Sequence, residues 1–277
     1  MRGSLPATGQ EFVRYGGHTS CLAISKDGDQ APTLLLDAGT GLTAASALFD
    51  GAPFRGTIAL SHLHWDHTHG LPFFAAGDRE DARVRVLVPE QEDGRSAEEA
   101  LTGLMSPPYF PITPGELRGQ WTIETVAERE HEVEGFGILA LTVPHKGGRT
   151  VGYRITSGER TLTYIPDHSP TALGPGPDGF GEYHEAALEL TRGADLLVHD
   201  SQLFKDELAA EGEFGHALGD YAVGLATRAG ARRVALFHHK FTRTDDQLDA
   251  LAQRLGAAPG DGAPEVIVAR EGETIEL

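Results

Sequence analysis

The sequence contains one cysteine, Cys21, among its 277 residues. An internal disulfide is therefore excluded, and so is a zinc site made of several thiolates. The sequence also lacks an apolar run of about 20 residues, the length that spans a bilayer. Its first ten residues do not follow the order of a secretion signal. We expect a soluble, cytoplasmic protein whose metal sites, if any, use His, Asp and Glu.

Basic residues are also few. The chain has 23 Lys and Arg against 41 Asp and Glu, a formal net charge of −18, and no run of Lys or Arg. Tight binding of a nucleic-acid backbone depends on clustered cations that displace counterions. We therefore expect a small-molecule substrate rather than a long nucleic acid, and no membrane partner.

Short apolar runs and helical patterns alternate along the chain. The apolar runs are bounded by turn residues and predict buried strands at 20–25, 33–37, 57–61, 83–88, 137–143, 161–165, 195–199 and 234–238. Helical spacing is found at 41–49, 96–105, 182–192, 219–229 and 244–255. There is no internal repeat and no long linker. The pattern predicts a layered α/β sandwich in a single domain over residues 1–277.

Four of the apolar runs lead directly into a residue that can bind a metal ion. These residues are His62, His145, Asp167 and His238. A rigid sheet fixes the backbone at the end of each strand, and the following loop can present a side chain. We therefore expect the four residues to share one site.

The histidine loop, which we define as residues 61–70, contains four histidines and one aspartate. Buried imidazoles and carboxylates need partners, and one cation can serve several of them. The alternative is a solvated polar loop. The histidine loop follows a buried strand, and other His and Asp residues lie at other strand ends. Both observations favour a metal site.

His62-x-His64-x-Asp66-His67 resembles the H-x-H-x-D-H signature of the metallo-β-lactamase superfamily. The resemblance implies a four-layer αββα sandwich of the α/β class and two divalent metal ions. Zinc is expected, with manganese, iron and nickel as alternatives. It further implies that one ion is held by His62, His64 and His145, that the other is held by Asp66, His67 and His238, and that Asp167 bridges them.

Two positions near the implied ligands are open to alternatives. Adjacent strand residues point to opposite faces, so only one of His238 and His239 can face the metals. The apolar run followed by His favours His238. Asp37 resembles a family aspartate that orients a ligand histidine, but it could equally cap a turn or the helix that follows.

Two further segments resemble the tRNase Z and cyclic-phosphodiesterase branches of the superfamily. They are His199-Asp200-Ser201 and Gly215-His216-Ala217. The resemblance implies that His216 donates a proton to the leaving oxygen and that Asp200 orients it, while Asp66 accepts a hydrogen bond from the nucleophile. Ser201 and Ala217 depart from the tRNase Z pattern. The alternative for His216 is a histidine on a polar glycine-rich loop.

The resemblance implies a phosphodiesterase that attacks a small phosphodiester, such as a cyclic one, with a hydroxide bridged by two metals. The basic arm with which tRNase Z grips tRNA is not visible in the sequence. A lactone or thioester hydrolase is the first alternative and would use Tyr109, Tyr164 or Tyr183. A metal-dependent protein that binds small anions without catalysis is the second.

Three features have no settled role. Arg149 could contact a substrate oxygen, although a surface or supporting role is preferred. His168 adjoins Asp167 and could reach the pocket. The loop 106–119 offers apolar surface that could cover the site or form the contact of a homodimer.

Overall fold

The computed structural model describes residues 1–256 and 262–277. The chain divides into two compact units, which we call the small and the large unit. The small unit comprises residues 19–127 and 132–135. The large unit comprises residues 1–18, 128–131 and 136–277. Each unit is described by itself.

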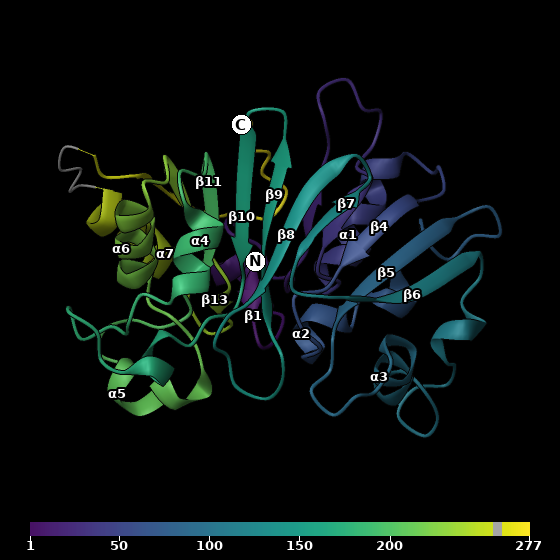
Figure 1. The fold of residues 1–277 in the computed structure, drawn as a ribbon, viewed down its shortest axis with the longest axis horizontal. Coiled ribbons are helices and arrows are strands. Elements are labelled where there is room, and N and C mark those ends of the chain that lie inside the picture. The colour runs from purple at the N-terminus through teal and green to yellow at the C-terminus, as the bar shows by residue number, and fades with distance from the viewer. Residues whose placement is uncertain (257–261) are drawn as a thin grey trace. The chain divides into compact units, whose positions relative to one another are not determined.

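A five-stranded sheet forms the centre of the small unit (Figure 1). Its strands lie in the order β2 (Leu22–Ile24), β3 (Leu34–Leu36), β4 (Arg55–Ala59), β5 (Arg83–Pro89) and β6 (Gln120–Val126). β2 is antiparallel to β3, and β3 to β6 are parallel. The helices are α1 (Gly41–Ala45), continued by a 3-10 turn at Ser46–Phe49, α2 (Trp65–Thr68) and α3 (Ala97–Leu104).

The core of the small unit is built from strand residues such as Leu35, Ile58 and Val86, all almost fully buried. The rings of Phe49, Phe54 and Phe74 meet edge to face at centroid distances of 5.2–5.9 Å. Edge-to-face pairs of this kind add to the stabilisation from area burial. The sheet is thereby a rigid support for the loops at its edge.

A seven-stranded sheet forms the centre of the large unit. Its strands lie in the order β14 (Glu265–Val268), β12 (Arg233–Phe237), β11 (Leu196–Asp200), β10 (Arg160–Ile165), β9 (Val151–Ser157), β8 (Phe136–Thr142) and β7 (Glu130–Val133). β1 (Arg2–Gly3) pairs in parallel with β13 (His239–Lys240). The helices are α4 (Glu185–Thr191), α5 (Leu208–Glu211), α6 (Gly219–Ala229) and α7 (Asp245–Gly256), of which α4, α6 and α7 pack in one core with the strands.

Strand direction explains why the polar residues of the large unit converge. β10, β11 and β12 are parallel, and β8 and β10 are both antiparallel to β9, so β8 runs in the same direction as β10. The carboxyl ends of β8, β10, β11 and β12 therefore lie at one edge of the sheet. The residues that end or follow these strands are His145, Asp167, Asp200 and His238.

The predicted strands and helices are present, with boundaries shifted by a few residues at most. The helix predicted at 41–49 changes from α to 3-10 geometry at Ser46. The strands β6, β7, β9 and β14 were not predicted. Along β6, for example, exposed and half-buried residues alternate and no continuous apolar run results. The single domain over residues 1–277 stays a prediction. Within the described residues, no helix has both the length and the apolar composition needed to cross a bilayer.

Candidate metal centre

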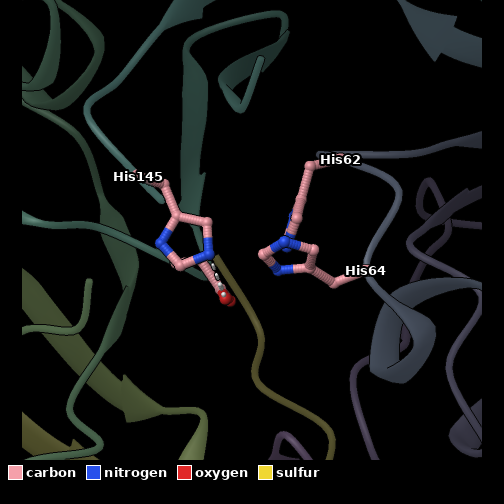
Figure 2. A group of neighbouring side chains, drawn as sticks. His62, His64 and His145 are labelled. Atoms are coloured by element: carbon pink, nitrogen blue, oxygen red, sulfur yellow. Dashed lines mark ion pairs between the residues drawn. The ribbon is translucent and has the colours of Figure 1, made fainter. Parts of the chain in front are cut away.

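The histidine loop of the small unit begins directly after β4. His62 and His64 lie in its extended part, and α2 carries Asp66 and His67. The His62 ring centroid is 4.4 Å from that of His64 and 4.2 Å from that of His67. Figure 2 shows the His62 and His64 side chains leaving this loop. The loop thus gathers three imidazoles and one carboxylate, and His62, Asp66 and His67 are buried.

Asp37 orients His67. Its Oδ2 atom accepts a hydrogen bond from His67 Nδ1 at 2.7 Å, and its Oδ1 atom accepts one from the Ser61 backbone N–H at 2.6 Å. The other ring nitrogen of His67, Nε2, lies 3.4 Å from Asp66 Oδ2. A carboxylate on the far nitrogen of an imidazole is typical of metal-binding histidines. Of the two interpretations of Asp37, these contacts support the orienting one, since the residue at the N-cap of α1 is Thr40.

A glycine is required where the histidine loop meets the loop after β3. A Cβ atom on Gly70 would lie 2.1 Å from the Gly39 carbonyl oxygen. The two segments are joined by hydrogen bonds from Gly70 N to Ala38 O at 2.7 Å and from Ala38 N to His67 O at 2.8 Å. This close backbone approach holds α2 and its Asp66 and His67 beside Asp37.

In the large unit, the strand-end group consists of His145, Asp167, Asp200, His216 and His238. His145 Nε2 lies 3.3 Å from Asp167 Oδ2, the ion pair that the dashed line in Figure 2 marks. His238 Nε2 lies 3.1 Å from Asp167 Oδ1. His145 Nδ1 donates to the Gly215 carbonyl oxygen at 2.7 Å. Asp167 therefore receives two ring nitrogens, and the orientation of one ring is set by a backbone carbonyl.

Within this group, Asp200 contacts His216. Its Oδ2 atom lies 3.1 Å from His216 Nδ1 and accepts backbone N–H groups of Ala217 at 3.0 Å and His168 at 3.2 Å. Its Oδ1 atom accepts the Gln202 N–H at 2.9 Å. His216 Nδ1 is also 3.9 Å from Asp167 Oδ2. The ligand atoms of Asp167, His216 and His238 all lie within 4.8 Å of one another.

The neighbouring histidines 238 and 239 face different surroundings. The chain leaves β12 at Phe237, and His238 has a positive φ of 56°. His239 instead places Nε2 at 3.3 Å from the Ala269 carbonyl oxygen and packs edge-on against Tyr15. Burial lowers the pKa of His239 well below its ordinary value, so this ring is neutral at pH 7. The geometry thus supports His238 as the residue that faces Asp167.

His168 and His199 form a buried pair whose role the sequence did not predict. His168 Nδ1 lies 3.0 Å from His199 Nε2, and His199 Nδ1 donates to the Asp200 carbonyl oxygen at 2.8 Å. Burial is the main cause that lowers the pKa of both rings. The His168 ring thus contacts His199 and packs edge-on against Tyr221. Its backbone N–H, rather than its side chain, contacts Asp200.

The tyrosines that a lactone or thioester hydrolase would use, and Arg149, have the following surroundings. Tyr164 is fully buried edge-on to Phe237, and Tyr183 stacks on Tyr221. Tyr109 lies in the small unit with 83% of its surface exposed. Arg149 is half-buried, and its Nη1 atom lies 3.5 Å from Glu128 Oε2.

The donor set is suitable for divalent metals. Imidazole nitrogens and carboxylate oxygens are borderline to hard ligands, which suit zinc as well as manganese, iron and nickel. In both units a histidine has one ring nitrogen held by an acceptor and the other directed at a carboxylate. Divalent metal binding is therefore supported by the residues themselves. The division of ligands between two ions stays a prediction.

A family model agrees with this site. The model of the β-lactamase superfamily domain matches residues 33–239, which include every predicted metal ligand. The chain belongs to this superfamily. It is a metal-dependent hydrolase of the metallo-β-lactamase type, as the resemblance implied.

Known relatives come from the tRNase Z branch of the superfamily. The chain is 28% identical over 264 residues to a ribonuclease Z of Lacticaseibacillus casei, an alignment that covers 83% of this chain and 82% of the relative. The metallo-β-lactamase fold protein YhfI of Bacillus subtilis superposes with a TM-score of 0.68 at 20% identity, covering 98% and 94% of the two chains. Human short-form tRNase Z gives a TM-score of 0.64 at 17% identity, covering 99% and 96%. These structural likenesses show that the fold is the predicted one.

Proposed function

We propose that this superfamily member is a phosphodiesterase that uses two divalent metal ions and acts on a small phosphodiester. The observation that carries the proposal is the contact of His216 with both Asp200, at 3.1 Å, and Asp167, at 3.9 Å. It pairs a potential proton donor with the carboxylate proposed to bridge the metals. Hydrolysis of a phosphodiester expels an alkoxide, which leaves readily only when it is protonated.

Each predicted site residue has a distinct proposed role. The ions, when bound, would supply positive charge against the phosphoryl oxygens and an activated water nucleophile. The residues that would hold them are His62, His64, Asp66, His67, His145, Asp167 and His238. Asp66 would also accept a hydrogen bond from the nucleophile and so fix its direction.

Asp200 would keep the protonated His216 ring in place. A carboxylate that accepts three backbone N–H groups is held in one position as an acceptor. Its negative charge stabilises an imidazolium beside it, and the proton then leaves from the ring to the departing oxygen. The buried His168–His199 pair adds packing behind Asp200 without adding charge, because burial keeps both rings neutral.

The size of the substrate is the point on which sequence and relatives disagree. The names of the curated relatives indicate RNA, in opposition to the expectation that long nucleic acid is not a substrate. The net charge of −18 and the lack of a Lys or Arg run support a small diester. Processing of an RNA is therefore the second candidate, and it is favoured only by those relatives.

The proposed proton donor can be tested separately from metal binding. In metal-analysed protein, turnover of a cyclic nucleotide, which expels an alkoxide, should fall by roughly 10²–10⁴-fold in His216→Ala while metal content is unchanged. His131→Ala, a histidine variant outside the site, is the matched control. Loss of metal in His216→Ala would instead make His216 a metal ligand, which its place within 4.8 Å of Asp167 and His238 allows.

Substrate class needs a second experiment. Cyclic nucleotides, a dinucleotide and a precursor tRNA should be compared under the same metal loading. We expect the small diesters to be hydrolysed and the tRNA to be cut slowly or not at all. Efficient, single-site cleavage of the tRNA would favour the second candidate, and hydrolysis of a lactone or thioester alone would contradict both.

A further inference from the structure

An apolar pocket of about 300 Å³ lies within the small unit. Its floor is made of buried side chains from β5, α3 and the turns after α2, among them Val86, Leu101 and Leu71. The loop that follows α3 closes one side with Met105 and Leu117. The volume is at the lower end of the range found for small-molecule sites.

Aromatic side chains surround the mouth of this pocket. Trp65, Phe73 and Tyr109 are 66%, 60% and 83% exposed. Phe73 also meets Phe110 edge to face at a centroid distance of 5.9 Å. Exposed aromatic groups gathered around a cavity are costly in water and typically mark a binding site. Tyr109 and Phe110 belong to the loop 106–119, so this loop helps to form the pocket.

The lining residues, all within the described part of the chain, include no Lys, Arg, Asp or Glu. The polar side chains in the lining are those of Thr40, Thr43, Thr68, His69, Tyr109, Trp65 and Trp121. The indole N–H of Trp121 already donates to the Arg118 carbonyl oxygen. A buried phosphate or carboxylate would find no Lys or Arg here to offset its desolvation. The pocket therefore suits an uncharged hydrocarbon group.

Helix α2 connects this pocket to the metal-binding residues. Trp65, Thr68 and His69 lie at positions i, i+3 and i+4, which share one face of a helix, and all three line the pocket. Asp66 and His67, predicted metal ligands, lie between them in sequence and on the other side of the helix. One helical turn thus presents ligands on one side and an apolar wall on the other.

We propose that this pocket binds an uncharged aromatic or alkyl arm of the substrate, so that the diester is carried to the ligands on the other side of α2. The inference rests on the proposed phosphodiesterase function. It narrows the substrate to an amphiphilic diester with one hydrocarbon arm, which a pocket of this volume accommodates up to roughly eight to ten carbons. The phosphates of an RNA would find no Lys or Arg in the lining of the pocket.

Binding can be measured without catalysis, because both tryptophans of the chain, Trp65 and Trp121, line the pocket. Intrinsic fluorescence of metal-stripped protein should change saturably with 1-octanol. Affinity should rise about fourfold for each methylene between 1-butanol and 1-octanol. Absence of a saturable change with 1-octanol in monomeric protein would overturn the proposal.

A charge in the pocket should abolish this binding. Leu104→Glu places a carboxylate in the lining, and we expect octanol affinity to fall at least about tenfold. Leu48→Glu is the matched control, because Leu48 is a half-exposed leucine of the same unit outside the lining. Thermal unfolding verifies that both variants fold. The unmodified alcohol series tests the proposal even if Leu104→Glu does not fold.

Turnover then tests whether the pocket serves the substrate. For 4-nitrophenyl alkyl phosphodiesters, kcat/KM should rise about fourfold for each added methylene, on the order of 10⁴-fold from methyl to octyl. The preference should disappear in Leu104→Glu, while turnover of the methyl diester is unchanged. Hydrolysis without an alkyl preference would overturn the role proposed for the pocket but not the proposed phosphodiesterase function. Octanol binding without hydrolysis of any diester would overturn both the proposed function and the substrate role of the pocket. A dimer that dissociates in Leu104→Glu and does not bind octanol would show that a second copy covers the pocket, which also overturns it.

Discussion

The small and large units each fix the orientation of a histidine ring, but they do so with different groups. Each holds a histidine with one ring nitrogen on an acceptor 2.7 Å away and the other facing a carboxylate. For His67 the distances are 2.7 Å to Asp37 and 3.4 Å to Asp66. For His145 they are 2.7 Å to the Gly215 carbonyl and 3.3 Å to Asp167.

The two arrangements differ in how the residues are brought together. The small unit has four predicted ligands within six consecutive positions, 62–67, and orients one of them with the carboxylate of Asp37. The large unit takes His145, Asp167 and His238 from the ends of three strands and orients His145 with a neutral backbone group. Local sequence therefore shapes the first site, and strand direction shapes the second. The charged contact should matter mainly for metal affinity, and the backbone contacts mainly for folding.

The largest effect on folding should come from the large unit. Asp200→Asn retains one acceptor oxygen but presents an amide N–H₂ to a site with three backbone N–H donors. We expect the free energy of unfolding of metal-free protein to fall by about 2–4 kcal/mol. Urea unfolding provides the measurement, and Asp206→Asn, an exposed aspartate of the same unit, is the control. Equal losses in the two variants would contradict this account of Asp200.

Metal affinity should respond most to the small unit. Asp37→Asn removes the charge that holds His67 Nδ1, while asparagine tolerates the positive φ of 60° at this position. Zinc affinity, measured by competition with a chelator, should weaken about 10–100-fold. Asp50→Asn is a close control because Asp50 is exposed and also has a positive φ, 46°. A change no larger than in that control would show that Asp37 does not orient a ligand.

A smaller effect is expected from the backbone contact of His145. In Gly215→Ala the added Cβ atom would lie 3.1 Å from His145 Nδ1, at a residue with φ of +92°. We expect a loss of about 1–2 kcal/mol in the free energy of unfolding and weaker zinc binding. Gly230→Ala has a comparable positive φ, +71°, but open space around its Cβ atom. The difference between the two variants reports the crowding against His145 and Lys146, and it should be measurable both in unfolding and in zinc affinity.

The smallest effect should come from a carboxylate at the surface. A hydrogen bond from Arg118 lowers the pKa of Asp78 below its ordinary value of 3.8. This pair therefore stabilises the folded state above that value, and the contribution disappears as pH falls through the lowered pKa. Arg118→Gln should lower the unfolding temperature slightly at about pH 7, and this difference from the unmodified protein should narrow as the pH falls below 3.8. A difference that widens in acid would reverse the assigned sign.

Several features of the site could be predicted from sequence because they depend on neighbouring residues. His62, His64, Asp66 and His67 were predicted from one segment, and the strand that precedes them was visible as an apolar run. Asp37 was left between two interpretations because its partner, His67, lies thirty residues away. Contact with a distant side chain leaves no mark on the local pattern.

Other features of the site could not be predicted from the types of residue along the chain. The Gly215 carbonyl and the N–H groups around Asp200 belong to the backbone, which every residue possesses. The His168–His199 pair depends on the register of β10 against β11. The apolar pocket combines segments between Thr40 and Ile123 whose hydrophobic residues would, from sequence, be expected in the core.

The sequence by itself determined the fold family and the strand ends that carry the predicted metal ligands, because apolar runs and chemically distinctive side chains are local properties. The tertiary structure alone decided which nitrogen of each histidine is held, which of His238 and His239 faces Asp167, and that the aromatic residues beside α2 surround a cavity. These depend on the direction and register of strands far apart in the chain. The positive φ takes His238 out of the extended strand conformation. The alternation of side chains along a strand therefore does not decide which of the two histidines faces Asp167.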